Sequence, residues 1–160
     1  PALGGLLLGV IAFRLPEIMG SGNRIIVSLF NQSHFNLSFL FILLLFKIIA
    51  TALTLGSGGS GGIFSPSLFI GSLTGIIIGV LFHQVFPFLS GSPSLYALIG
   101  MAAVISAVIR APLTATFIIL EFTHNYSLTI PLLIASLIAE RAASISGLKS
   151  AYSPEYFKRL

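Results

Sequence analysis

The residues of this chain that could do chemistry gather around one run of small residues and the short motif that follows it. The run is Gly56-Ser57-Gly58-Gly59-Ser60-Gly61, and the motif is Gly62-Ile63-Phe64-Ser65-Pro66. Long hydrophobic segments flank them on both sides. Within hydrocarbon, an unpaired backbone N–H or C=O costs several kcal/mol unless protein or water meets it. The stretch is therefore either a loop at a membrane surface or a break between helices that binds a ligand.

Phosphate-binding motifs and a flexible linker are the first alternatives for this stretch. Gly56, Gly58 and Gly61 fit the spacing G-x-G-x-x-G, but a long apolar run precedes them in place of a short strand, and no acidic residue follows about twenty positions on. A Walker A loop needs a lysine after its last glycine, where Gly62 stands. A Gly/Ser linker fits the composition. The motif at 62–66 continues directly into a patterned apolar segment, however, which argues against a linker.

A helix that starts at this motif would bind an anion. The first N–H groups of a helix have no intrahelical partner, and the aligned peptide dipoles give that end about half a positive charge. Anions bind there without a lysine or an arginine. Gly62 lets the backbone approach closely, Pro66 suits the first turn, and the apolar side chains of Ile63 and Phe64 leave their N–H groups as the polar donors. Such partial charges hold an ion and still allow its release.

The composition predicts an integral membrane protein. Of 160 residues, 56% are hydrophobic and 8% are charged, whereas soluble domains carry about 25% charged residues. Lysine and arginine are scattered without a basic stripe, so we expect the lipid bilayer, and no nucleic acid, as a partner. The chain has no cysteine and no aspartate, which excludes disulfides, thiolate metal sites and a Ser-His-Asp triad. Its histidines lack paired ligand spacing, so we expect no metal, no cofactor and no enzymatic activity.

Apolar runs of two lengths alternate along the chain. The long runs are residues 37–55, 67–86 and 128–145, and the short ones are residues 1–13, 95–109 and 113–122. A bilayer requires about 20 residues, and half-length runs broken by glycine or proline are typical of transporters with discontinuous helices. We therefore expect an all-α, multi-span bundle with short, tilted and broken helices. Four-residue spacing predicts that Gly71, Gly75 and Gly79 form a close-packing face, and likewise Gly5 and Gly9.

Charged residues lie within or beside these runs, and the roles of Lys47, Arg110 and Glu121 stay open. Lys47 would be costly facing lipid, so we expect it to face protein or to reach the interface. We expect Glu121 to be a structural partner, with Arg110 as its candidate, and Glu140 to be paired or to reach the interface. The basic residues within 147–160 predict a cytoplasmic C-terminus.

The motif Gly62-Ile63-Phe64-Ser65-Pro66 resembles the G-x-F-x-P signature of the CLC family of chloride channels and chloride/proton antiporters. Other segments resemble the C-terminal half of that family's membrane domain, over essentially the whole chain. They are Pro1-Ala2-Leu3-Gly4-Gly5, Pro16-Glu17-Ile18-Met19-Gly20-Ser21-Gly22, Ile109-Arg110-Ala111-Pro112-Leu113-Thr114 and Leu120-Glu121-Phe122-Thr123-His124-Asn125-Tyr126. Five motifs in the same order make the resemblance specific.

The resemblance implies that residues 1–160 form the C-terminal half of a CLC-type transmembrane domain, one half of an inverted-repeat transporter. The anion would be held by the N–H groups of Ile63 and Phe64, beside Gly62, and by the hydroxyl of Tyr152. Position alone would make Tyr152 an interfacial aromatic. The family's serine ligand and its G-x-E-G-P gating glutamate do not occur here. We therefore expect the chain to be a fragment, completed by the missing N-terminal half of the same protein.

The resemblance also implies a function and an assembly. The function is transmembrane transport of chloride or a similar inorganic anion, with chloride as the transported ligand. The alternative is a cation-coupled solute carrier with discontinuous helices, which would use carbonyl-rich sites at helix C-termini. Family members form homodimers, with an interface largely in segments that resemble residues 3–30 and 113–145. We expect a multi-pass protein, in the plasma membrane if bacterial; channel and antiporter are not separated.

Overall fold

The computed structural model describes residues 2–18, 36–59, 61–88 and 91–153, and these residues form helices without a strand. The elements are α1 (Ala2–Arg14), η1 (Pro16–Ile18), α3 (Leu37–Gly56), α4 (Phe64–Val85), α5 (Pro93–Ile109), α6 (Pro112–Thr123), η2 (Tyr126–Leu128) and α7 (Thr129–Ile145). The all-α fold is therefore confirmed. The end of the second family-like segment, from residue 19, lies outside the described residues.

Local sequence signals explain where several helices begin. The Asn36 side chain accepts hydrogen bonds from the N–H groups of Ser38 and Phe39 and so caps α3. Ser92 caps α5 in the same way, and Pro93 occupies its first turn, where the missing N–H is no loss. Helix α4 begins at Phe64, earlier than residue 67, because the chain accommodates Pro66 within the first turn.

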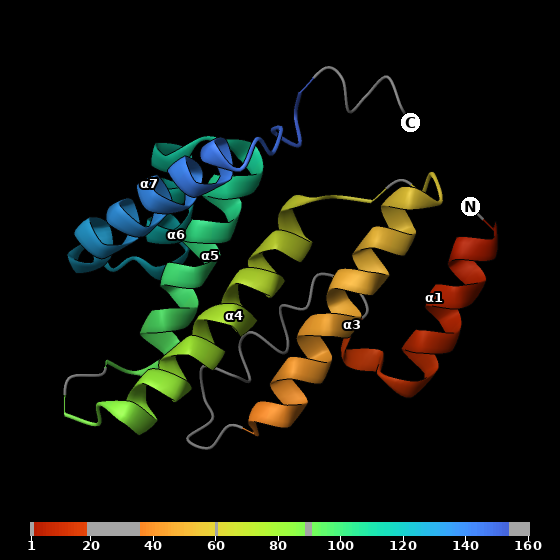
Figure 1. Cartoon of the computed structure of the whole chain (residues 1–160), viewed down its shortest axis with the longest axis horizontal. Coiled ribbons are helices and arrows are strands. Elements are labelled where there is room, and N and C mark those ends of the chain that lie inside the picture. The colour runs from red at the N-terminus through yellow and green to blue at the C-terminus, as the bar shows by residue number, and fades with distance from the viewer. Residues whose placement is uncertain (1, 19–35, 60, 89–90, 154–160) are drawn as a thin grey trace.

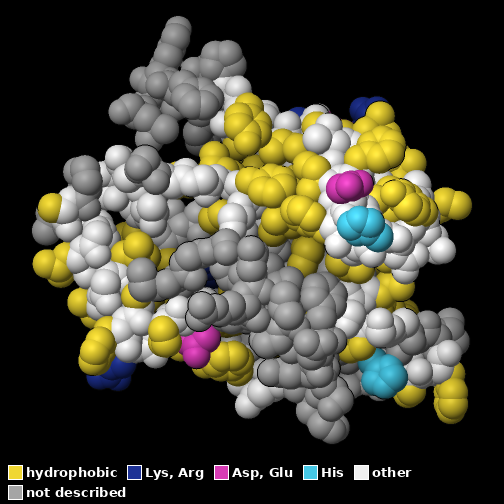
Figure 2. Space-filling view, turned by 180° about the vertical axis from the view of Figure 1, so that it is seen from behind, with side chains coloured by type: hydrophobic (Ala, Val, Ile, Leu, Met, Phe, Trp, Pro, Cys, Tyr) yellow, Lys and Arg dark blue, Asp and Glu magenta, His cyan; other side chains and the backbone are white. Residues whose placement is uncertain are grey.

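The helices have the two lengths that the sequence predicts. Among the helices of the described residues, three are long and apolar enough to cross a membrane: Leu37–Gly56, Phe64–Val85 and Tyr126–Ile145. Gly4–Arg14, Pro93–Ile109 and Pro112–Thr123 are shorter apolar helices. Hydrophobic side chains are spread over the described surface in Figure 2, with few charged groups among them. Such a surface suits contact with lipid and confirms an integral membrane bundle.

Helix α5 lies between two groups of helices (Figure 1). It packs along α4 on one side and against α6 and α7 on the other, while α3 joins α1 to α4. Helices α3, α4 and α5 run alternately up and down in Figure 1, so the end of α3, the start of α4 and the end of α5 share one end of the molecule.

Small residues bring α4 and α5 into backbone contact. A Cβ atom on Gly71 would lie 2.6 Å from the carbonyl oxygen of Gly100, and one on Gly75 would lie 2.9 Å from the Cα of Ala97. Gly79 faces the ring of Tyr96 in the same interface. The predicted packing face of α4 is therefore confirmed, and its consequence is a fixed register between the two helices.

The predicted packing face of α1 differs from the observed one. Apart from its chain neighbours and the nearby backbone of α1, a Cβ atom on Gly5 or Gly9 would meet no described atom within 4 Å. The neighbouring Gly4 is buried instead and faces Ser57 at the end of α3. The four-residue spacing on α1 therefore marks a surface of the described chain, because α1 turns the adjacent side of the helix toward α3.

Candidate anion site

The connection between α3 and α4 begins with a turn that depends on glycine. After α3 ends, the N–H of Ser57 donates to Leu53 O at 3.0 Å and that of Gly59 to Thr54 O at 3.0 Å. Gly58 has a left-handed φ of 74°, which glycine adopts without a steric penalty. A Cβ on Gly59 would lie 2.8 Å from Thr54 O. These contacts end α3 and direct the chain toward the start of α4.

The start of α4 presents backbone donors without a side-chain cap. Ile63 is the N-cap residue, and its side chain forms no capping hydrogen bond. The N–H of Ser67 donates to Ile63 O at 3.1 Å, as the first helical turn requires. The N–H of Phe64 precedes that turn, so it has no intrahelical acceptor. The helix end therefore carries the partial positive charge and the backbone donors without intrahelical acceptors that bind anions elsewhere.

A cavity of about 310 Å³ adjoins this segment, between α1, η1 and α3. Its lining includes Gly61, Gly62, Ser65 and Pro66, together with Lys47 from the middle of α3. Neither Ile63 nor Phe64 is among the lining residues. The structure thus places Gly62 at the cavity wall and the two proposed N–H donors immediately beyond it along the chain.

Lys47 faces protein, as expected. Its side chain is buried, with 4% of its surface exposed. The ammonium donates to Ile18 O at 2.7 Å and lies 4.8 Å from the centre of the Phe69 ring, where a cation interacts favourably with the ring face. A positive charge is therefore held beside the cavity that borders the α3–α4 connection.

Tyr152 lies in a turn beyond α7 that returns to the end of α5. The N–H of Ala151 donates to Val108 O at 3.0 Å, and the Ser150 hydroxyl donates to Ile109 O at 3.3 Å. Tyr152 itself is 59% exposed. Its segment therefore sits at the same end of the α4–α5 pair as Phe64 (Figure 1), although no hydrogen bond joins Tyr152 to α4 within the described chain.

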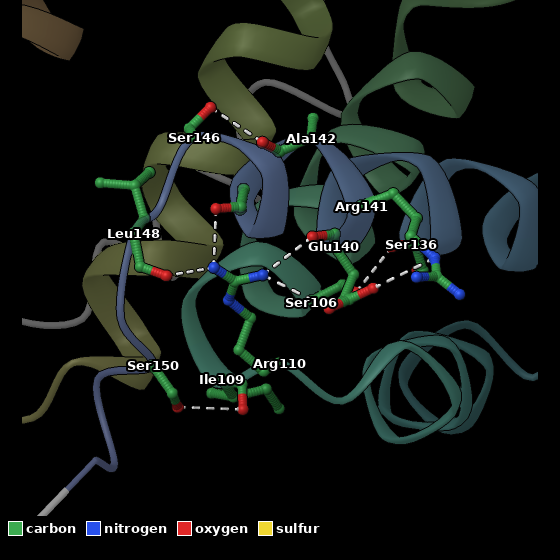
Figure 3. Close-up of polar contacts among 11 residues, drawn as sticks. Ser106, Ile109, Arg110, Ser136, Glu140, Arg141, Ala142, Ser146, Leu148 and Ser150 are labelled. Carbon is green, nitrogen blue, oxygen red and sulfur yellow. Dashed lines mark hydrogen bonds and ion pairs between the residues drawn. The ribbon is translucent and has the colours of Figure 1, made fainter.

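Arg110 does not pair with Glu121, which corrects the sequence-based prediction. Glu121 is exposed on α6. The Arg110 guanidinium instead lies 3.3 Å from the Glu140 carboxylate on α7 and donates to backbone carbonyls near it (Figure 3). Glu140 is therefore paired, as expected. The sequence shows an arginine at a helix break, but its partner lies thirty positions further along the chain, so the pairing could not be predicted from spacing.

Buried hydroxyl groups join α5, α6 and α7, and they are absent from the site residues predicted from the sequence. The Ser106 hydroxyl donates to Ser136 O at 2.7 Å, and the Thr116 hydroxyl lies 3.3 Å from the Ser136 hydroxyl. Ser106 and Ser136 are fully buried. Isolated small polar residues in apolar runs are the signal that was available, since hydroxyls bond across helices in membrane bundles.

Comparison with known proteins shows similarity to chloride transporters. The H+/Cl− exchange transporter ClcA of Vibrio vulnificus (strain YJ016) is 37% identical over 151 residues, which are 94% of this chain and 32% of that protein. ClcA of Vibrio cholerae serotype O1 (strain M66-2) is 36% identical over 149 residues, with 93% and 32% covered. The chain therefore spans about a third of the length of these curated relatives.

A solved structure and a family match agree with these similarities. The crystal structure of a slow cyanobacterial Cl−/H+ antiporter superposes with a TM-score of 0.71 at 36% identity, over 76% of this chain and 28% of that one. The sequence model of the family described as "Voltage gated chloride channel" matches residues 1–144. Tyr152 lies beyond that range. The chain belongs to the voltage-gated chloride channel family, the CLC family that its motifs resemble.

Proposed function

We propose that this chain forms part of a membrane pathway for chloride or a similar inorganic anion. The start of α4 carries the proposal. There, the G-x-F-x-P segment of the family opens a helix whose N-cap residue, Ile63, provides no side-chain cap. The N–H groups of Ile63 and Phe64 would bind the anion, and Gly62 would let it approach the backbone. Because these donors carry only partial charges, the anion can exchange them for water and move on.

The hydroxyl of Tyr152 is the proposed third donor. Its segment is held at the end of α5, which lies at the same end of the molecule as the start of α4. A neutral hydroxyl suits this task because it donates to an anion and adds no charge that would trap it. Further walls of the site would come from the remainder of the protein, since the curated relatives are about three times as long as this chain.

The proposed assembly follows from the surface of the described helices. Large apolar side chains are exposed on α6 and α7, including Phe117, Ile130, Ile134 and Ile138. This surface would contact lipid and a second copy of the protein in a homodimer. A plasma-membrane location and a cytoplasmic C-terminus are part of the same proposal. The family match removes the main support for a cation-coupled carrier, which rested on the discontinuous helices alone.

Chloride flux in liposomes and calorimetric titration with chloride, both on the full-length protein, test the proposal. Tyr152→Phe removes the hydroxyl and keeps the ring, and Tyr126→Phe is the matched control because Tyr126 is also exposed, at 68%. A hydrogen bond to a charged partner contributes about 1.5–3 kcal/mol, which corresponds to roughly 10–100-fold in affinity. We expect Tyr152→Phe to weaken chloride binding by at least about tenfold and Tyr126→Phe to leave it unchanged.

Each possible result bears on a different part of the proposal. Absence of chloride flux in the wild-type protein would overturn the proposed function. Unchanged binding and anion selectivity in Tyr152→Phe would remove Tyr152 from the site. Proton movement recorded together with chloride distinguishes exchange from passive conduction, and fluoride and nitrate in place of chloride give the anion preference.

A further inference from the structure

We propose that Arg110 is a positioning residue for the anion site, which holds the segment carrying Tyr152 against the end of α5. This inference rests on the proposed function, because it takes Tyr152 as an anion ligand. Arg110 lies directly after α5 and precedes α6 by one residue, Ala111. It is therefore placed where α5, α6, α7 and the returning segment meet (Figure 3).

The backbone conformation of Arg110 is the first observation. Its φ is 61°, in the left-handed region, at the C-cap position of α5. Glycine is the usual residue in this conformation at a helix end, because a Cβ atom disfavours it. Arginine at such a position indicates that the side chain contributes interactions that offset the backbone penalty.

The contacts of the guanidinium are the second observation. One terminal nitrogen donates to Glu140 O at 3.0 Å and to the Glu140 carboxylate at 3.3 Å. The other donates to Ala143 O at 2.7 Å and to Leu148 O. These carbonyls lie in the last turns of α7, which ends at Ile145, and just beyond it, where a cation complements the helix dipole. The arginine side chain, 17% exposed, thus joins the last turns of α7 to the segment beyond it.

The returning segment is the third observation, because its residues donate hydrogen bonds back to carbonyls at the end of α5. The Ser150 hydroxyl donates to Ile109 O, and the Ala151 N–H donates to Val108 O. Consecutive residues at the end of α5 therefore bind Leu148, Ser150 and Ala151. Tyr152 follows directly, so these contacts fix where its side chain begins.

The close contact between α4 and α5 fixes the position of the end of α5 relative to α4. Gly71 and Gly100 bring the two helices into backbone contact, so the end of α5 is a rigid support relative to the start of α4. Arg110 acts on the anion through this support. Without the guanidinium, the segment at 148–152 would sample more conformations, and ordering it on binding would lower the affinity for chloride.

Two readouts on the full-length protein in detergent test the positioning role. Hydrogen exchange measures protection of the Ala151 amide, and calorimetric titration with chloride measures affinity. We expect Arg110→Gln to lose Ala151 protection and to weaken chloride binding about fivefold or more, an effect of ordering cost. Arg141→Gln is the matched control, because Arg141 is one residue from Glu140 and 81% exposed. It should change neither readout.

A double-mutant cycle distinguishes positioning from general destabilisation. If Arg110 acts through Tyr152, then Arg110→Gln should have little further effect on chloride binding in the Tyr152→Phe background. Additive effects would overturn the inference. So would retained Ala151 protection or unchanged affinity in Arg110→Gln, while Tyr152→Phe alone weakens binding. If Tyr152→Phe leaves the affinity unchanged, the assigned ligand fails, and the positioning role fails with it.

Milder variants keep the test available if Arg110→Gln does not yield a monodisperse protein. Ser150→Ala removes the hydroxyl bond to Ile109 without touching the guanidinium. Arg110→Lys keeps the charge and loses the fork that reaches several carbonyls at once. Both variants should shift protection and affinity in the same direction as Arg110→Gln, by a smaller factor. Wild-type values in both would contradict the proposal.

Discussion

Two buried or half-buried cations in this chain both donate to backbone carbonyls near helix ends, yet their surroundings differ. Arg110 lies in a closed junction, where its guanidinium meets three carbonyls and the Glu140 carboxylate. Lys47 donates to Ile18 O and lies over the Phe69 ring, on the wall of a cavity of about 310 Å³.

The two sides of the molecule are therefore built for different tasks. The side around α4, α5, α6 and α7 is packed through small residues and buried hydroxyls, and it supplies a rigid support. The side around α1 and α3 leaves space beside the start of α4 and keeps a positive charge next to that space. An anion pathway needs both features, since donors must be fixed while the ion moves.

Overfilling the contact between α4 and α5 with a larger side chain should have the largest effect on folding. Gly75→Val would place side-chain atoms against the backbone of Tyr96 and Ala97, and overpacking costs about 1–3 kcal/mol or more. Because backbone cannot move aside as a side chain can, we expect loss of monodisperse protein on gel filtration. Gly91→Ala, whose Cβ would be 3.7 Å from Leu95, is the control and should behave as wild type. A stable Gly75→Val would show that the support is not rigid.

Removing the arginine cation should have the next largest effect on stability. Arg110→Met removes the guanidinium that donates to three carbonyls and a carboxylate, and removing one partner of a buried ion pair costs about 3–5 kcal/mol. With 17% and 22% of the two side chains exposed, we expect about 2 kcal/mol after screening. The thermal unfolding midpoint of the full-length protein measures it. An unchanged midpoint would mean that the junction contributes no net stability.

Removing the lysine cation should affect stability less and chloride flux more. Lys47→Met leaves the Ile18 carbonyl without this donor, at about 1 kcal/mol, and it removes a positive charge beside the cavity. The flux should fall most at low salt, because screening by added salt already weakens the field of Lys47. Lys47→Arg, which keeps the charge, is the control. Equal flux in Lys47→Met and wild type at low salt would remove Lys47 from the pathway.

The ion pair between Arg110 and Glu140 should give the smallest change in stability. Glu140→Gln weakens the contact with Arg110 and should cost about 1 kcal/mol, whereas Glu121→Gln changes an exposed side chain and should stay within about 0.5 kcal/mol of wild type. Thermal unfolding of both variants, side by side, decides between the two partners. The reverse order would restore Glu121 as the partner of Arg110.

Local features of the fold could be predicted from the sequence. Hydrophobic length and helix breakers depend on neighbouring residues, so the presence of long and short helices and the break before Phe64 were predicted correctly. The four-residue glycine spacing likewise predicted the α4 face that meets α5. For the site, the G-x-F-x-P segment indicated a helix start with open donors, and α4 begins there without a side-chain cap.

Pairings across the fold could not be predicted in the same way. The sequence shows that Arg110 and Lys47 must find polar partners, but not that one finds Glu140 and the other Ile18. Both partners are about thirty residues away, and only the packing of helices brings them together. The packing of Gly5 and Gly9 was also not predictable, because the spacing of small residues does not reveal which neighbouring helix, if any, lies opposite.

The central claim is that a backbone N–H at the start of α4 binds the anion, and an amide-to-ester exchange at Phe64 tests it most directly. The exchange removes one N–H and keeps the phenyl side chain. The same exchange at Phe88, which is 99% exposed beyond the end of α4, is the matched control. We expect chloride binding to the full-length protein to weaken by about 10–100-fold for the ester at Phe64, as loss of a hydrogen bond to a charged ligand implies. The control should bind as wild type. Wild-type affinity with the ester at Phe64 would contradict the account.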